Sequence, residues 1–308
     1  KRHWMRIGIS LTTALFGYKA RAGAQMIIER CAAAADAGLD SLFVGDHHST
    51  SPLSYFQNVP ILGRILAEWD TRPAGALFLL PLWHPVLLAE QIGTLAAIHK
   101  GPFILQCAVG PDDRQFPALG VPVKQRPSRF EQSLEIMRRL WDGEKVSSDG
   151  RWTFKDAEIS PVPEESISVW IGANSSVALD RAARISDGWL GSPGLTLKQA
   201  SAFSAEYAEK CVAYGKSRET VAIRRDVYVG KNDEEAMETT APVLNKGYRG
   251  IDPSALAIGD PKTVADEFQK LAEVGYTDVI VRNIVQDQRS ALESIKRLSE
   301  VRERLLDV

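Results

Sequence analysis

The sequence alternates short apolar runs with amphipathic stretches eight times, and this alternation limits the folds open to the chain. The apolar runs have the length and the near-continuous hydrophobicity of parallel strands that are buried on both faces. The stretches between them place apolar residues at helical spacing, most clearly over 126–141. Because repeated strand–helix units form a parallel sheet with right-handed crossovers, the pattern predicts an α/β protein.

The expected elements follow one another in a regular order. Strands are predicted at 6–11, 41–45, 74–81, 103–110, 168–173, 188–192, 221–230 and 278–282. Helices are predicted at 22–38, 57–69, 85–98, 126–141, 175–186, 198–214, 233–245, 261–274 and 290–306. Alternation and prolines in 150–163 predict a small antiparallel insertion between the fourth helix and the fifth strand.

Eight units in 308 residues fit a closed (βα)8 barrel, the TIM barrel, better than an open sheet. An open dinucleotide-binding sheet usually carries a GxGxxG turn after its first strand, and the sequence has none there. We therefore predict a single (βα)8-barrel domain over residues 1–308, in which residues 1–4 are an extension before Met5.

The composition argues against several classes of partner. A formal net charge of −2 predicts no basic surface for nucleic acid or anionic membrane, and no apolar run is long enough to span a bilayer. The three cysteines, Cys31, Cys107 and Cys211, are far apart and lack metal-binding spacing. We expect a cytoplasmic protein without a disulfide framework or a zinc site.

Four polar segments follow predicted strands, where a (βα)8 barrel places its active site. They are GDHHST after the second strand, LLPLWHP after the third, AVGPDDRQF after the fourth and IGANSS after the fifth. Their convergence predicts one site on this rim. The substrate is expected to be a small molecule chosen by the neighbouring loops, including 52–56 and 246–260.

In GDHHST, adjacent residues at a strand end point to opposite sides, so His47 and His48 are not expected to share a metal ion. One of the two can face the barrel mouth, with Asp46 beside it to fix its tautomer or to help position a cofactor. Alternatively, both histidines satisfy local backbone groups, and the residues alone leave the choice open.

In IGANSS, the backbone N–H groups of Asn174, Ser175 and Ser176 precede a helix and can hold a phosphate. A plain N-cap by Ser175 or Ser176 is the alternative. Asp187 and Trp189 can border the same pocket.

The third segment, LLPLWHP, contains two features of interest. His84 is expected to serve packing or capping rather than chemistry. A strained peptide at Leu79 and Leu80 can bear against a flat cofactor.

Three longer segments resemble the bacterial luciferase-like monooxygenase superfamily. They are RPSRFEQSLEIMRRLWDG, VWIGANSSVALDRAARISDGWL and GDPKTVADEFQKLAEVGYTDVIVR. The resemblance runs from Met5 to about Leu305 and implies the (βα)8 barrel and an oxidoreductase that uses FMN or the 8-hydroxy-5-deazaflavin coenzyme F420. It also implies a flavin-reducing or F420-reducing partner and a homodimer.

The resemblance also implies roles for individual residues. His47 would be catalytic, with Asp46 beside the ring, and a non-prolyl cis peptide near Leu79 and Leu80 would shape the ring pocket. The turn after the fifth strand would bind the cofactor phosphate. The implied cofactor-binding residues are Asp46, Leu79, Leu80, Gly110, Gly172, Ala173, Asn174, Ser175 and Ser176.

One departure from the resemblance concerns the substrate. Deazaflavin-linked sugar-phosphate dehydrogenases of the superfamily carry a Gly-Glu pair after the fourth strand, whereas Gly110 is followed here by Pro111 and Asp112. This argues against sugar-phosphate oxidation. The preferred hypothesis is a monooxygenase that uses reduced FMN and oxygen. The alternatives are F420-dependent hydride transfer without oxygen and a non-catalytic flavin-binding barrel.

Overall fold

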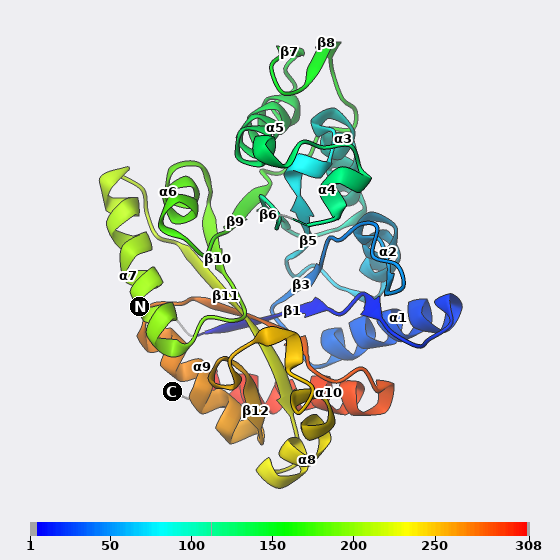
Figure 1. Cartoon of the computed structure of the whole chain (residues 1–308), viewed down its shortest axis with the longest axis vertical. Helices are drawn as coiled ribbons and strands as arrows, with labels where there is room; N and C mark the ends of the chain where they lie inside the picture. Colours follow the sequence, from blue (N-terminus) through cyan, green and yellow to red (C-terminus); the bar gives the residue numbers. More distant parts are fainter. Residues whose placement is uncertain (1–4, 112, 307–308) are drawn as a thin grey trace.

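Eight parallel strands form a closed barrel in the computed structural model, which describes residues 5–111 and 113–306 (Figure 1). The barrel strands are β1 (Arg6–Leu11), β3 (Ser41–Val44), β5 (Ala74–Leu79), β6 (Phe103–Ala108), β9 (Ser168–Gly172), β10 (Gly188–Gly191), β11 (Thr220–Val229) and β13 (Asp278–Asn283). Neighbours pair in the order β10, β9, β6, β5, β3, β1, β13 and β11, and β11 pairs with β10 to close the sheet. The predicted (βα)8 barrel is confirmed.

Helices connect the strands and cover the outside of the barrel (Figure 1). They are α1 (Ala20–Asp36), α2 (Asn58–Ile65), α3 (Pro85–Ile98), α4 (Gln115–Ala118), α5 (Arg126–Trp141), α6 (Ser176–Ile185), α7 (Leu197–Ala213), α8 (Asp233–Leu244), α9 (Pro261–Glu273) and α10 (Gln288–Leu306). In α9, Asp260 accepts a hydrogen bond from the Thr263 N–H at 2.7 Å, and Gly275 follows the helix with φ of +97°. Both predicted ends of this helix are therefore confirmed. No helix within the described ranges has the length and apolar character to cross a bilayer.

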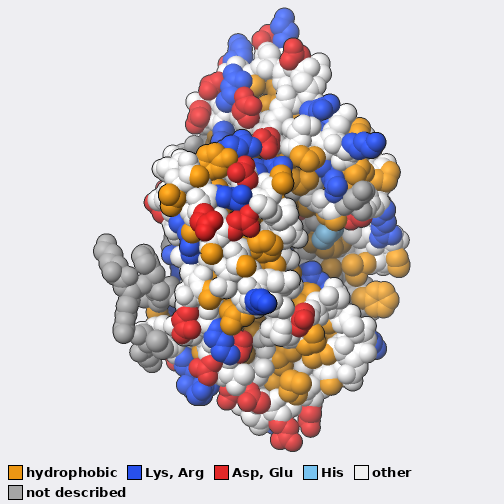
Figure 2. All heavy atoms as spheres, turned by 60° about the vertical axis from the view of Figure 1, so that its left-hand side comes forward, with side chains coloured by type: hydrophobic (Ala, Val, Ile, Leu, Met, Phe, Trp, Pro, Cys, Tyr) orange, Lys and Arg blue, Asp and Glu red, His pale blue; other side chains and the backbone are white. Residues whose placement is uncertain are grey.

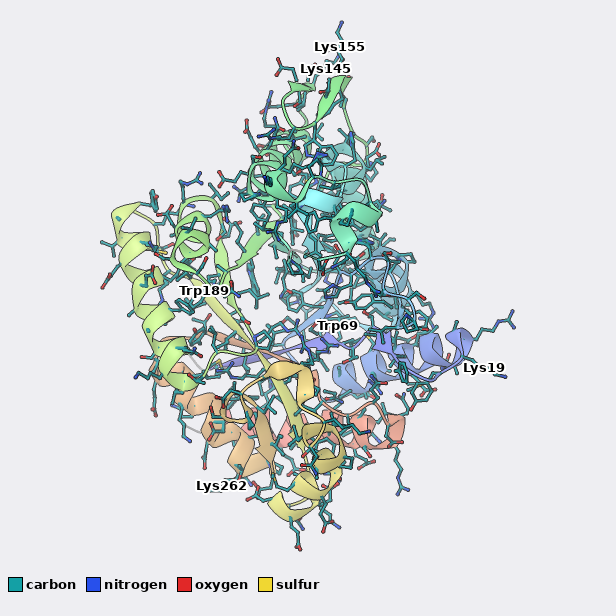
Figure 3. All side chains as sticks on the ribbon, in the orientation of Figure 1. Lys19, Trp69, Lys145, Lys155, Trp189 and Lys262 are labelled. Atoms are coloured by element: carbon teal, nitrogen blue, oxygen red, sulfur yellow. The ribbon has the colours of Figure 1, made fainter. Side chains whose placement is uncertain are left out.

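A two-stranded antiparallel hairpin interrupts the barrel units between α5 and β9. It consists of β7 (Val146–Asp149) and β8 (Thr153–Ala157), so it begins and ends earlier than the predicted segment 150–163. The hairpin projects at the top of Figure 1, away from the barrel. In Figure 3, Lys145 and Lys155 lie at the top of the view with the hairpin, whereas Trp189 lies inside the molecule beside α7.

Two further pairings were not predicted, because the strands involved are only two or three residues long. Strand β2 (Ala14–Leu15) pairs with β4 (Ser54–Tyr55) and joins the segments that follow β1 and β3. Strand β12 (Ala257–Gly259) adds to the end of β11, whose ten residues outrun the barrel. Both pairings fix loops at the carboxyl end of the barrel, where the site is expected.

The interior of the barrel is filled by one apolar layer, which we call the plug. Inward side chains of six strands form it, namely Phe43, Ile104, Trp170, Leu190, Ala222 and Ile280. A much larger apolar core packs the outer face of the sheet against the helices. Because the plug closes the middle of the barrel, open space can occur only at its ends.

Candidate active site

The floor of the site lies one layer beyond the plug, towards the carboxyl ends of the strands. Residues two positions further along a strand point to the same face. At this level β3, β9 and β10 lead into the small residues Gly45, Gly172 and Ser192, while β11 and β13 contribute Arg224 and Arg282. The small residues leave the barrel open, and the two arginines place positive charge beside the space.

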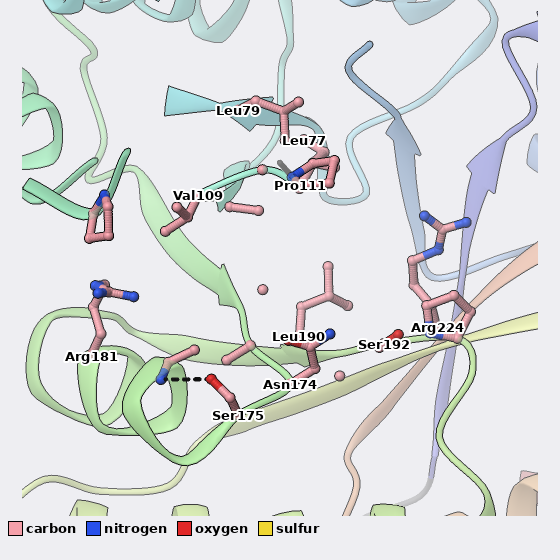
Figure 4. A pocket seen from close by; sticks show the side chains of 18 of the residues that line it. Leu77, Leu79, Val109, Pro111, Asn174, Ser175, Arg181, Leu190, Ser192 and Arg224 are labelled. Atoms are coloured by element: carbon pink, nitrogen blue, oxygen red, sulfur yellow. Dashed lines mark hydrogen bonds between the residues drawn. The ribbon is translucent and has the colours of Figure 1, made fainter. Parts of the chain in front are cut away.

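A cavity of about 580 Å³, which we call the larger cavity, opens beside β5, β6, β9 and β10 (Figure 4). Leu77, Leu79 and Val109 line one wall, and Leu190 lies on the facing side. The predicted site residues that line this cavity are His47, Leu79, Gly110, Gly172, Ala173, Asn174 and Ser175. The structure thus brings together most of the residues that the sequence implicated, although Asp46, Leu80 and Ser176 do not line it.

A second cavity of about 440 Å³, the smaller cavity, adjoins His47. Of the described residues, only His47 lines both cavities. The smaller cavity also meets Phe16, Tyr55, Arg249 and Arg282, so both loops that were expected to select the substrate contribute to it. Figure 2 shows a hollow in the surface that contains a histidine and a basic side chain.

The position of His47 is set by neighbours on two sides. Its ring meets the edge of Tyr55 at 5.1 Å between centroids, and its carbonyl oxygen accepts a hydrogen bond from the Gln57 side chain at 3.0 Å. Burial lowers the pKa of His47, and the nearby carboxylate of Asp46 only partly opposes this shift. The imidazole is therefore neutral at neutral pH, and one ring nitrogen can accept a proton.

Asp46 supports the site from behind the cavity wall. Its fully buried carboxylate accepts hydrogen bonds from the Leu79 N–H and from the indole N–H of Trp83, each at 2.8 Å. The other carboxylate oxygen lies 3.0 Å from Nε2 of His48, off the angle of a strong hydrogen bond, so the attraction is mainly electrostatic. Burial opposes protonation of His48, but Asp46 outweighs it and raises the pKa of His48. Of the two histidines, His47 lines both cavities, whereas His48 lies against Asp46 and lines only the smaller one.

The peptide between Leu79 and Leu80 differs from the prediction. Within the described residues, the cis peptide bonds are Ser51–Pro52 and Ser160–Pro161, so the expected non-prolyl cis bond was wrong. The chain leaves β5 through a 3-10 turn over Leu80–Leu82. Leu79 faces the larger cavity, while Leu80 is buried in the outer core.

The turn before α6 carries the predicted N-cap and also presents backbone N–H groups without helix acceptors. Ser175 caps the helix, because its Oγ accepts a hydrogen bond from the Ala178 N–H at 3.4 Å. The N–H groups of Ser176 and Val177 belong to the first turn and have no acceptor within the helix. Arg181 lines the cavity one turn later, held by Glu131 at 2.9 Å. The cap therefore leaves room for an anion at this helix end, and phosphate binding there stays a prediction.

Three other predicted candidates lie outside both cavities. Trp189 is buried and donates from its indole N–H to the carbonyl of Ala173 at 2.9 Å, so it supports the turn from behind. Asp187 precedes β10, at the opposite end of that strand from the cavity, and accepts from the Val169 N–H. His84 packs against the hairpin residues Trp152 and Phe154 and makes no side-chain cap, which confirms a packing role.

The larger cavity fits a flavin-type cofactor, which combines a flat ring with a phosphorylated chain. Its apolar walls suit the ring, and the uncapped N–H groups before α6 with Arg181 suit the phosphate. His47 lies at the edge shared with the smaller cavity. A metal centre has no such support, since the described part of the chain holds no group of three His, Cys, Asp or Glu side chains that could ligate an ion.

Besides Arg114, which lies in the segment after the fourth strand, four arginines line the cavities and were not identified from the sequence, namely Arg181, Arg224, Arg249 and Arg282. Two of them lie in apolar strands, VAIRRDVYVG and DVIVRN. A charged residue at an inward position of a buried parallel strand is unusual, so this pattern could have revealed Arg224 and Arg282. Arg181 and Arg249 lie in a helix and a loop, where arginine is common.

The model of the family described as luciferase-like monooxygenase matches residues 5–257. An F420-dependent glucose-6-phosphate dehydrogenase of Nakamurella multipartita is 30% identical over 58% of the chain and 56% of that relative. A protein of the same name from Beutenbergia cavernae is 26% identical over 90% of the chain and 94% of that relative. The chain thus aligns with little more than half of the first relative and with nearly all of the second.

Two solved structures of proteins named as monooxygenases share the fold. Monooxygenase RslO1 from Streptomyces bottropensis has a TM-score of 0.85 at 16% identity, covering 96% of this chain and 98% of its own. The FMN complex of the oxygenating constituent of 3,6-diketocamphane monooxygenase from Pseudomonas putida has a TM-score of 0.82 at 20% identity, covering 98% and 99%. At such identities these matches establish the fold alone.

Proposed function

The chain belongs to the luciferase-like monooxygenase family of oxidoreductases, and we propose that it transfers hydride with coenzyme F420 and without oxygen. The observation that carries the mechanism is the position of a neutral His47 between two cavities. The choice of F420 is supported by the relatives named as F420-dependent dehydrogenases, one of which aligns along nearly its whole length. This proposal replaces the preference for reduced FMN and oxygen that the sequence suggested.

In this proposal each cavity has one occupant. The larger cavity holds the cofactor, with its ring between the leucine-lined walls and its phosphate at the start of α6. When bound, the deazaflavin supplies a carbon that accepts or donates a hydride. The smaller cavity holds the substrate beside His47. In alcohol oxidation, His47 takes the hydroxyl proton while the substrate carbon gives up its hydride, and in the reverse reaction His47 returns that proton.

Glucose 6-phosphate itself is not the proposed substrate. The relatives carry that name, but the resemblance implies a Gly-Glu pair after the fourth strand in such dehydrogenases, whereas Gly110, with φ of +86°, is followed here by Pro111. Both line the larger cavity, and neither offers a carboxylate, while Asp112 lies outside the described residues. We propose a different small hydroxyl or carbonyl compound.

Anaerobic turnover tests this function. The protein would be mixed with F420 or FMN and a panel of small alcohols and hydroxy acids, and the absorbance of each cofactor would be followed with and without oxygen. We expect reduction of F420 in the absence of oxygen. Turnover that requires both FMN and oxygen would overturn the proposal.

A further inference from the structure

We infer that the smaller cavity binds an anionic group of the substrate, a carboxylate or a phosphate, through Arg249 and Arg282, with Arg224 adding positive charge from the side of the larger cavity. The inference rests on the proposed function only in assigning this cavity to the substrate. Three guanidinium groups from different parts of the chain lie near one buried carboxylate, that of Asp226, which pairs with Arg224 and Arg249 and lies directly across the strand ladder from Arg282. We call Arg224, Arg249 and Arg282 the arginine cluster.

The strand register brings the cluster together. Arg224 and Asp226 are two positions apart on β11, so both side chains point to the barrel interior. Asp226 is the direct partner of Arg282 across the β11–β13 ladder. Arg249 reaches the same place from the 3-10 turn Tyr248–Gly250, which follows α8.

The hydrogen bonds of Asp226 fix the geometry of the cluster. Its carboxylate is fully buried and accepts hydrogen bonds from Arg249 and, at 2.8 Å, from the hydroxyl of Tyr248. Nη2 of Arg224 lies 3.7 Å away, at ion-pair rather than hydrogen-bond distance. Two arginines, Arg224 and Arg249, thus share the single carboxylate of Asp226.

The positive charge of Arg282 has few compensating neighbours. Its Nε donates a long hydrogen bond of 3.3 Å to the Thr12 hydroxyl, and no acidic side chain within residues 5–111 and 113–306 forms an ion pair with it. Asp113 and Arg114 also line the cavity, and their charges offset one another. The cluster therefore carries an excess of positive charge, which an anion would neutralise.

Arg224 lines the larger cavity and adds positive charge next to Arg249 and Arg282. Burial and the nearby charge of Arg282 lower the pKa of Arg224 to about 10, which still leaves it protonated at neutral pH. Its Nε and Nη2 are buried and have no hydrogen-bond acceptor among the described residues. A buried, protonated guanidinium without acceptors is costly unless a bound group supplies them.

The anion is assigned to the substrate rather than to the cofactor. Figure 4 shows Arg181, beside the turn proposed for the cofactor phosphate, at the opposite end of the view from Arg224. Arg249 and Arg282 line the smaller cavity and not the larger one. The remaining wall includes Phe16, which suits a compact organic acid or phosphate ester with an uncharged part.

Equilibrium binding of simple anions tests the inference without turnover. Inorganic phosphate and acetate would be titrated calorimetrically into wild type and into Arg249→Gln and Arg282→Gln, with Arg139→Gln as the control, because Arg139 lies at the surface paired with Glu144. We expect saturable binding of at least one anion by wild type and the control, weakened about tenfold or more in both cluster variants. The anion that binds more tightly identifies the substrate's charged group.

Three results would overturn the inference. The first is equal anion affinity in wild type and both cluster variants, which would assign the anion to the turn before α6. The second is the absence of saturable binding by wild type. The third is loss of anion affinity in Arg139→Gln. Arg282→Lys controls for misfolding, because it keeps the positive charge and is expected to retain part of the anion affinity. An F420 titration of the same proteins tests the proposed function separately, since the cluster variants should bind F420 as wild type does.

Discussion

The two cavities that meet at His47 are built on different principles. The larger one is lined mainly by leucines, glycines and small polar residues at the ends of adjacent strands, with Arg181 and Arg224 at its two ends, and the groups proposed to bind the cofactor phosphate include backbone N–H groups before α6. The smaller one depends on long charged side chains that strands and loops bring together. A fixed apolar slot suits a cofactor of constant shape, whereas arginines around a small space suit recognition of one charged group.

The largest expected effect is at the boundary between the cavities. His47→Gln keeps the approximate size of the side chain but removes a group that exchanges a proton near neutral pH, so turnover should fall about 100-fold or more. The affinity for F420 and for simple anions should change little. Single-turnover rates and equilibrium titrations would measure both, and an unchanged rate would remove His47 from the mechanism.

Filling the larger cavity should separate it from the smaller one. A β-carbon on Gly172 would lie 3.5 Å from the Ala108 side chain, an ordinary contact, and Gly172 lines the cavity. We therefore expect Gly172→Val to fold and to bind F420 about tenfold or more weakly, while acetate or phosphate affinity at the arginine cluster stays the same. Parallel loss of both affinities would contradict two independent cavities. Gly172→Ala, with a smaller side chain, provides the graded comparison.

Asp46 should affect chemistry more than binding. Asp46→Asn retains an oxygen acceptor for the Leu79 N–H and the Trp83 indole but loses the negative charge near both histidines. We expect turnover to fall up to about tenfold, with F420 affinity nearly unchanged. A loss of cofactor affinity larger than the loss of rate would show that Asp46 acts directly on the cofactor.

The pH profile gives a smaller and more specific effect. Because burial lowers the pKa of His47, its neutral form persists to lower pH than that of an exposed histidine. The acid limb of the pH profile of kcat/KM for alcohol oxidation should therefore lie below about pH 6.5. The charge of Asp46 raises that pKa, and Asp46→Asn should therefore move the acid limb to still lower pH. A shift towards higher pH in Asp46→Asn would contradict the assignment.

The smallest effect is expected at His84. This residue packs against Trp152 and Phe154, away from both cavities, so His84→Gln should alter stability by about 1 kcal/mol and leave turnover and both affinities unchanged. Thermal unfolding and steady-state rates would measure this. A large loss of turnover would mean that the hairpin influences the site.

The sequence predicted the barrel and the larger cavity well, because both depend on local patterns. Strand–helix alternation sets the barrel, and the segments after the second, third and fifth strands supply His47, Leu79 and the turn at Asn174. These residues reach the site directly from the ends of their own strands. Their positions therefore follow from the fold alone.

The smaller cavity was harder to predict, because it depends on long-range pairing. Asp226 and Arg282 become partners only through the register of β11 with β13, and Arg249 reaches them from a loop. The position of Asp46 was also not foreseeable in detail, since its buried partners Leu79 and Trp83 are more than 30 residues away along the chain. Register and side-chain direction, rather than strand order, decide such contacts.

The central claim is that the larger cavity binds F420, and one anaerobic equilibrium titration tests it most directly. Wild-type protein would be titrated with F420 and, in parallel, with FMN, and the bound fraction would be followed by cofactor fluorescence. We expect saturable binding of F420 that is at least tenfold tighter than that of FMN. Tighter binding of FMN, or no binding of F420, would contradict it.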